Sequence, residues 1–193
     1  MDRRELPGRL RKGSPQTILS FILHHQPEII HHGKRYSLHH LTDASHAFSW
    51  QAKSGETCNF VLEIRYSNHC YSDAKLPLTL GCATVPDRGT QRVFCPSRYA
   101  QSFKLPIMFS NLANRPTTRV GVLRQNFNVF EIQTDGMLYY AFFSLRPFKD
   151  ESANRGRLNL FVESAYERPD KVPSRRKIPF GMLAESVASG AKL

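Results

Sequence analysis

The sequence predicts an α+β fold: an antiparallel sheet that includes a C-terminal three-strand meander, with short helices near both ends and in the middle. Two observations predict the sheet. Residues 128–133, 137–145 and 157–166 are rich in β-branched and aromatic residues, and an Asp-Gly turn and a polar segment separate them. Residues 46–51 and 58–66 alternate apolar and polar residues around a Ser-Gly turn, which is typical of a hairpin.

The helices are predicted from three weaker patterns. Residues 17–32 contain an apolar run that is broken at a proline. Residues 96–113 are expected to form one or two short helices, with Pro106 in a first helical turn. A last short helix is expected over residues 179–189. Residues 67–95 are punctuated by prolines and glycines, so we expect loops and short strands there.

The last predicted strand has a particular face pattern. Strict alternation from residue 157 places five side chains on one face and Glu163 on the other. Those five are Leu158, Leu160, Val162, Ser164 and Tyr166. A polar pair that ends an otherwise apolar face can mark the rim of a cleft.

The chain of 193 residues is long enough for one domain. Residues 1–16 carry five basic residues and almost no apolar ones, so we interpret them as a mobile basic arm, and residues 17–193 as a single globular domain. No segment resembles a membrane span or a signal peptide, which predicts a cytoplasmic protein with no membrane partner. The four cysteines are expected to be reduced thiols, with Cys58 and Cys95 in the core.

The formal net charge of +11 favours a polyanionic partner, RNA above all, and is also compatible with an inhibitory or acidic protein partner. No carboxylate occurs between Asp87 and Glu131, whereas seven basic residues do. A solvated surface normally mixes both signs, so we interpret this stretch as a phosphate-binding surface. Its predicted nucleic-acid-binding residues are Arg88, Arg92, Lys104, Arg115, Arg119 and Arg124. Loosely scattered surface charge is the alternative.

No metal or cofactor is predicted. The histidine doublets between His24 and His40 straddle a proline and a glycine and do not share one face, so we interpret them as an exposed His-rich segment. The cysteines lack the CxxC spacing of zinc sites. The acidic residues show no obvious arrangement for Mg²⁺, which ranks a metal-dependent nuclease below a metal-free mechanism.

His69 is the strongest candidate for a catalytic residue. It lies where a confident strand gives way to loop, and Ser67, Asn68 and Ser72 can orient its imidazole. Histidine can both accept and donate a proton near neutral pH. The alternative is a structural histidine bonded to a backbone carbonyl.

This basic chain shares three features with a known family: an early helix, a central histidine and a last strand that ends in Ser164-Ala165-Tyr166. It resembles the metal-independent ribonuclease toxins of the barnase/EndoU/colicin/RelE type, most clearly over about the last 40 residues. The resemblance implies RNA cleavage by transphosphorylation. His69 is then the acid or base, Arg98 stabilises charge on the phosphate, and Ser164 and Tyr166 orient the substrate.

Two hypotheses of other classes remain. The chain could be a non-catalytic nucleic-acid-binding or regulatory module that uses the same arginines, with His69 structural. It could also be a small protein-interaction subunit whose basic tails meet an acidic partner. Whether the protein is an enzyme therefore stays open at this level, with a metal-independent endoribonuclease as the enzymatic hypothesis.

Overall fold

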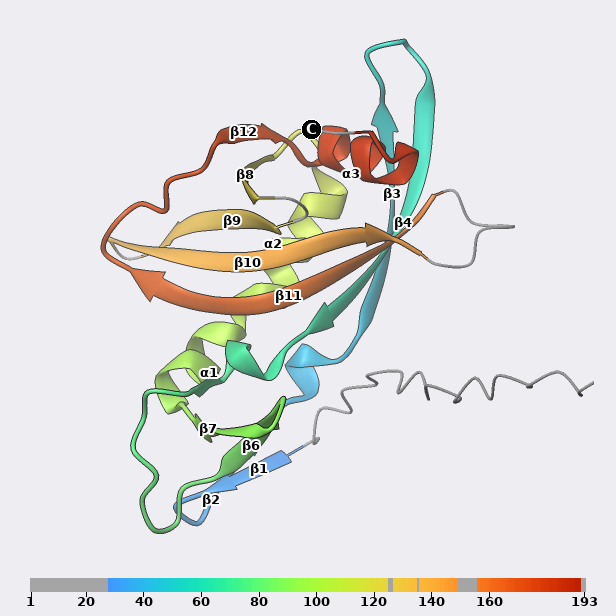
Figure 1. Cartoon of the computed structure of the whole chain (residues 1–193). Helices are drawn as coiled ribbons and strands as arrows, with labels where there is room; N and C mark the ends of the chain where they lie inside the picture. Colours follow the sequence, from blue (N-terminus) through green and yellow to red (C-terminus); the bar gives the residue numbers. More distant parts are fainter. Residues whose placement is uncertain (1–27, 125–126, 135, 149–155, 192–193) are drawn as a thin grey trace, which may run out of the picture.

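The computed structural model describes residues 28–124, 127–134, 136–148 and 156–191. Strands dominate it and helices pack against them, which confirms the α+β class (Figure 1). The expected arm, residues 1–16, lies outside the described residues, as does most of the helix expected at 17–32. Its remaining part is a strand, Glu28–His31, so no helix forms there.

A seven-stranded sheet forms the body of the molecule. Its spatial order is β12 (Arg176–Pro179), β8 (Arg119–Arg124), β9 (Phe127–Thr134), β10 (Met137–Pro147), β11 (Arg157–Arg168), β4 (Thr57–Tyr66) and β3 (Ala44–Gln51). All neighbours are antiparallel except β11 and β4, which run parallel. Pairing of β3 with β4 confirms the predicted hairpin, and Phe60, Leu62, Ile64 and Tyr66 are all buried, as their alternation indicates.

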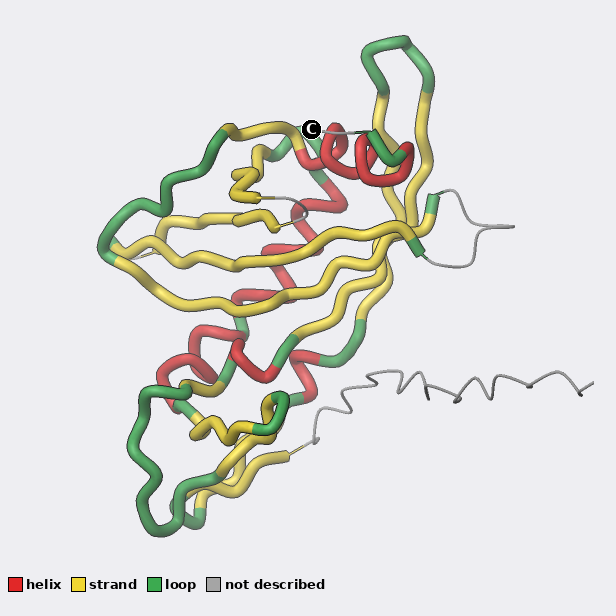
Figure 2. Tube along the Cα trace, in the orientation of Figure 1, coloured by secondary structure: helices red, strands yellow, loops and turns green. Residues whose placement is uncertain are grey.

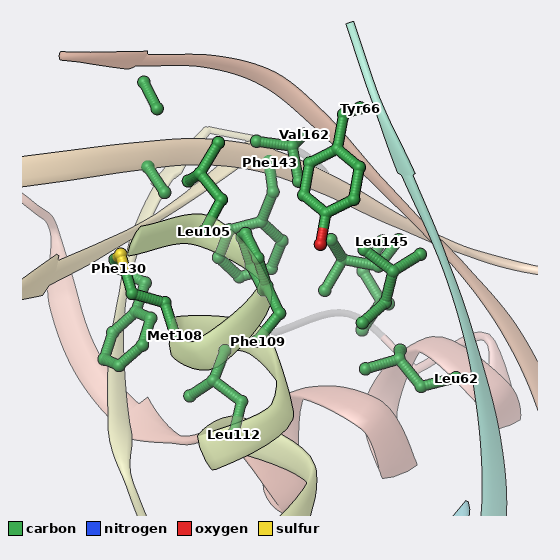
Figure 3. Close-up of a cluster of buried hydrophobic side chains, with 14 of the residues drawn as sticks. Leu62, Tyr66, Leu105, Met108, Phe109, Leu112, Phe130, Phe143, Leu145 and Val162 are labelled. Carbon is green, nitrogen blue, oxygen red and sulfur yellow. The ribbon is translucent and has the colours of Figure 1, made fainter. Parts of the chain in front are cut away.

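Two longer helices cover one face of this sheet, α2 (Lys104–Asn114) and α3 (Phe180–Ser189), while α1 (Pro96–Ser102) lies below it (Figure 2). On α2, Leu105, Met108, Phe109 and Leu112 recur at helical spacing and are at most 3% exposed. Figure 3 shows them meeting side chains from β4, β10 and β11. This contact forms the main core, over which β4 and β11 lie side by side as paired strands.

Glycine at position 181 lets α3 approach β3 closely. A Cβ at this position would overlap the ring of Trp50. The indole Nε1 of Trp50 donates to Glu185 Oε2 at 2.9 Å, one turn further along α3. The helix is therefore fastened to β3 by a close ring contact and a hydrogen bond.

Two small sheets form the other end of the molecule. The first pairs β5 (Ser72–Asp73) with β7 (Thr90–Phe94) and β7 with β6 (Thr84–Asp87). The second is the hairpin of β1 (Glu28–His31) and β2 (Lys34–Ser37). Two 3₁₀ turns, η1 (His39–Leu41) and η2 (Asn68–Cys70), connect this end to β3 and β4. Strands β5, β6 and β7 fall within residues 67–95, which were predicted to hold loops and short strands.

A β-bulge in β11 changes which of its side chains face the core. Phe142 pairs with Ser164 and Phe143 with Val162, so Glu163 is an extra residue that has no paired residue on β10. Beyond it Ala165, rather than Ser164 or Tyr166, is buried in the main core. The prediction that Ser164 and Tyr166 share a face with Leu158, Leu160 and Val162 is therefore wrong.

Candidate functional site

A cavity of about 960 Å³ opens where the large sheet meets the smaller sheet of β5, β6 and β7. The end of β4, the turn η2, the β6–β7 turn and the bulged part of β11 surround it. Its lining residues are Asp43, Arg65, Tyr66, Ser67, Asn68, His69, Pro86, Asp87, Arg88, Thr90, Phe161 and Glu163. The cavity therefore holds five charged side chains and one histidine within a partly apolar wall.

His69 lies in this cavity with an ionisable partner. Its Nε2 is 2.7 Å from Asp87 Oδ2, and about a third of its side chain is exposed. When Nε2 carries a hydrogen and donates it in a hydrogen bond to Asp87, Nδ1 is the ring nitrogen that can exchange a proton with a substrate. The pair therefore has the arrangement of an oriented acid–base histidine.

Local sequence fixes the backbone of His69. Ser67 caps η2: its Oγ accepts from the backbone N–H of His69 at 3.0 Å and donates to the carbonyl of Glu163 at 2.6 Å. The side chain of Asn68 donates to the carbonyl of Pro86 at 2.7 Å, next to Asp87. These bonds tie η2 both to β11 and to the strand that carries the histidine's partner.

Asp87 and Glu163 are two residues of the cavity that the sequence did not place near His69. Asp87 ends β6 and also lies 3.6 Å from Nη1 of Arg92. Glu163 is the bulged residue of β11, and its Oε1 accepts a hydrogen bond of 3.1 Å from the hydroxyl of Ser144 on β10. The only signal in the sequence was the end of the apolar alternation after Val162, where Glu163 and Ser164 are two consecutive polar residues.

Two arginines supply positive charge to the cavity. Arg65 pairs with Asp43 at 3.3 Å, and both side chains are more than half exposed. Arg88 is exposed and has a backbone φ of +45°, followed by Gly89 at +88°. Two consecutive positive φ values between Asp87 and Thr90 describe a tight hairpin turn in which glycine or asparagine is preferred over arginine. Strained residues of this kind cluster at functional sites.

The remaining predicted catalytic residues lie outside the lining of this cavity. Nη1 of Arg98 donates to the carbonyls of His69, at 3.2 Å, and Ser72, at 3.0 Å, and its Nη2 pairs with Asp73 at 2.9 Å. Its guanidinium lies 5.2 Å from the ring centre of Tyr166. Arg98 thus holds η2 through the backbone of His69, and its donors are directed at the protein.

Ser164 and Tyr166 lie on the other side of β11 from the main core. Tyr166 stacks on Phe142 at 5.3 Å and belongs to a small second cluster with Tyr140 and Val129. Its role in the structure is to cover this outer face of the sheet.

The predicted phosphate-binding residues do not form one surface. Arg92 is only 9% exposed and binds the hydroxyl and carbonyl of Ser72, so it is a buried structural residue. Lys104 pairs with Glu167 at 3.2 Å. Arg119 and Arg124 lie on β8, which Figure 1 shows apart from the β6–β7 hairpin. Arg115 is exposed just before β8.

Buried hydroxyl and thiol groups beneath the cavity stay protonated. Burial raises the pKa of the fully buried Cys70 to about 12. It also raises the pKa of Tyr66, which lines the cavity, well above its ordinary value. Neither group is therefore a base or a nucleophile near neutral pH, which leaves His69, Asp43, Asp87 and Glu163 as the candidate acids and bases of the cavity.

One histidine doublet is placed differently from the prediction. His31, His32 and Cys82 bring three ligand atoms within 4.8 Å of one another, the one such group of His, Cys, Asp or Glu found among the described residues. His31 is buried, so the expectation of an exposed His-rich segment does not hold for this residue. His24 and His25 lie outside the described residues.

Comparison with known proteins identifies a family. The model of the YjaZ family matches residues 28–188. The chain belongs to the YjaZ family. No curated protein and no solved structure matches the chain. Within the residues that the structure describes, no helix of this YjaZ family member is long and apolar enough to cross a membrane.

Proposed function

We propose that this YjaZ family member is a metal-independent endoribonuclease that cleaves RNA by transphosphorylation. One observation carries the proposal: the His69–Asp87 pair shares a cavity with a second carboxylate, Glu163, and with Arg65 and Arg88. Cleavage of this type needs one base, one acid and positive charge near the phosphate. The cavity offers all three from residues of this chain.

The bond changes assign a role to each residue. Glu163 accepts the proton of the ribose 2′-hydroxyl, whose oxygen attacks the adjacent phosphorus. The phosphorus–5′-oxygen bond breaks, and imidazolium His69 donates its Nδ1 proton to the departing oxygen. Asp87 stabilises this imidazolium through its bond to Nε2, as a carboxylate does in other acid–base histidines. The products are a 2′,3′-cyclic phosphate and a free 5′-hydroxyl.

Arg65 and Arg88 take the phosphate-binding role in place of Arg98. Both line the cavity, whereas Arg98 donates to backbone carbonyls and Asp73. Arginine suits this role because its planar guanidinium makes paired contacts with phosphate oxygens. Arg98 becomes a positioning residue for η2.

A non-catalytic nucleic-acid-binding module is the second candidate. It is favoured by the bonds from His69 to Asp87 and from Asn68 to Pro86, which together fasten the β6–β7 hairpin to η2. In this case Arg65 and Arg88 bind phosphate, and His69 serves stability alone.

Incubation of the purified full chain with unstructured RNA in excess EDTA separates the two candidates. We expect cleavage to fragments that end in 2′,3′-cyclic phosphate, and no cleavage of DNA of the same sequence, because DNA lacks the attacking hydroxyl. Glu163→Gln should lower the rate by about 10²–10⁴-fold. Glu56→Gln, an exposed carboxylate in the β3–β4 turn, is the matched control and should cleave like the wild type.

Binding of RNA without cleavage would favour the second candidate. Cleavage that requires a divalent cation, or that yields 5′-phosphates, would contradict the proposed mechanism.

A further inference from the structure

The cluster of His31, His32 and Cys82 has the geometry of a metal centre. In an extended strand consecutive side chains point to opposite faces. His32, however, follows β1 with a backbone φ of +48°, and Gly33 follows at +74°, which makes the tight turn to β2. This left-handed residue rotates the His32 side chain toward His31, so the two ring centres are only 4.4 Å apart.

Two hydrogen bonds from backbone N–H groups hold the loop of Cys82 beside the two histidines, although Cys82 is 50 residues from His32 in the sequence. The N–H of His32 donates to the carbonyl of Gly81 at 2.8 Å, and the N–H of Ala83 donates to His31 Nδ1 at 3.2 Å. Gly81 has a φ of +82°, and a Cβ there would lie 3.0 Å from His32 Nδ1. The loop before β6 is thus shaped to place Cys82 beside both rings.

The separation of the ligand atoms agrees with tetrahedral zinc. Cys82 Sγ lies 3.6 Å from His32 Nε2, and all three ligand atoms lie within 4.8 Å of one another. With Zn–S of about 2.3 Å and Zn–N of about 2.0–2.1 Å, a tetrahedral ion separates sulfur from nitrogen by about 3.6 Å. The three atoms bind one ion once the remaining separations, each at most 4.8 Å, shorten to a similar value.

The surroundings support the same ion. Thr79 Oγ1 lies 2.9 Å from Cys82 Sγ and can donate to a bound thiolate, which is how outer groups orient metal ligands. His31 is buried, Cys82 is half-buried and His32 is exposed, so the site has one wall of protein and one side open to solvent.

We propose that His31, His32 and Cys82 bind one zinc ion, with water as the fourth ligand. Two imidazoles and one thiolate are borderline-soft donors that suit zinc rather than magnesium or calcium. The ion fastens the β1–β2 hairpin to the loop that leads into β6. This inference is independent of the proposed nuclease chemistry, because it involves no residue of the cavity.

Zinc titration of the full-length, tag-free chain, stripped of metal with EDTA, tests the proposal. We expect one Zn²⁺ per chain in a chelator-competition assay and a rise in the melting temperature on binding. Cys82→Ser and His32→Asn should each weaken binding by about 100-fold. Asparagine is chosen for position 32 because it tolerates positive φ values.

Matched controls identify the ligands. Cys58→Ser alters another half-buried cysteine and His39→Asn another exposed histidine, and both should bind zinc like the wild type. A His24→Asn/His25→Asn double variant should do the same. Zinc affinity that falls with the His24/His25 variant and persists in Cys82→Ser would overturn the assignment.

Cobalt gives an answer that does not depend on whether the variants fold. Co²⁺ bound to the wild-type chain should show a thiolate-to-cobalt charge-transfer band and the visible spectrum of a tetrahedral ion. Absence of the charge-transfer band at saturating Co²⁺ would mean that no cysteine is a ligand, and the proposal would fail.

Discussion

At the scale of single residues, two non-glycine residues of the described chain have positive φ values, and each belongs to a candidate site. Arg88 lies at the cavity and His32 in the cluster with Cys82. A side chain in this backbone region costs about 1–2 kcal/mol, so it persists where the side chain itself is useful. This correlation motivates a test at the cavity.

We expect Arg88→Gly to trade function for stability. Glycine relieves the strained turn and should raise the free energy of unfolding by about 1 kcal/mol. The same change removes the proposed phosphate contact of Arg88, so RNA affinity should fall. Denaturant melts and RNA titrations measure the two effects, with Arg88→Lys as a control that keeps the charge and the strain. Unchanged RNA affinity in Arg88→Gly would exclude Arg88 from the binding surface.

Cys70 gives the protein a dependence on alkaline pH. Its pKa is raised by burial to about 12 from an ordinary value of 9.0, so the folded state disfavours the thiolate. The contribution to stability is complete below pH 9.0 and is lost as the pH rises toward about 12. We therefore expect the urea concentration at the unfolding midpoint to decrease as the pH is raised from about 8 to about 10, roughly one unit to either side of the ordinary pKa.

The same burial predicts thiol reactivity. In the native protein at pH 8, roughly the pH of common labelling assays, Cys58 and Cys82 should react with a thiol reagent while Cys70 stays unmodified. Modification of Cys70 at the rate of Cys58 would show that η2 opens readily, and the rigid positioning of His69 would be in doubt.

At the scale of elements, sequence patterns were reliable where alternation was regular. The β3–β4 hairpin follows directly from alternation around Ser54-Gly55. One or two short helices were expected over residues 96–113, with Pro106 in a first turn, and the structure has two, α1 and α2. The strand Glu28–His31 was missed because its apolar residues continue a run that also fits a helix, and pairing with β2 decides its conformation.

The candidate site was harder to predict because it depends on departures from regular structure. One extra residue at Glu163 moves Ser164 and Tyr166 off the core face and brings a carboxylate to the cavity. Asp87 and His69 are 18 residues apart and meet only through the fold of β6 onto η2. His69 itself could be chosen as a candidate, since the end of a strand was visible in the sequence, and its catalytic role stays a prediction.

Helix α3 offers a test of packing at this scale. Gly181→Ala places a methyl group against the ring of Trp50, so we expect a loss of about 1–3 kcal/mol and a melting temperature lower by several degrees. Ser189→Ala, at the exposed end of the same helix, is the control and should stay within about 0.5 kcal/mol of the wild type. An unchanged melting temperature in Gly181→Ala would mean that Trp50 does not pack as described.

At the scale of the whole molecule, the net charge of +11 should make RNA binding strongly dependent on salt. Charge alone does not locate the binding surface, because β8, which carries Arg119 and Arg124, lies apart from the β6–β7 hairpin, which carries Arg88 (Figure 1). Structure therefore replaces the single surface expected from the sequence with two separate groups.

We expect Arg65→Glu/Arg88→Glu to weaken RNA binding more than Arg3→Glu/Arg4→Glu. Each lost phosphate contact should lower the slope of log affinity against log salt by about 0.7. Arg119→Glu/Arg124→Glu tests the exposed arginines of β8. If that pair has the larger effect, the binding surface lies on β8 and the cavity is not the RNA site.

The most direct measurement of the central claim is the rate of RNA cleavage by His69→Ala in excess EDTA, recorded with its melting curve. We predict that the rate falls by about 10²–10⁴-fold while RNA affinity and the cooperative melting transition are retained. His39→Ala, an exposed histidine outside the cavity, should cleave at the wild-type rate. Equal rates for His69→Ala and the wild type, with both proteins folded, would contradict the account.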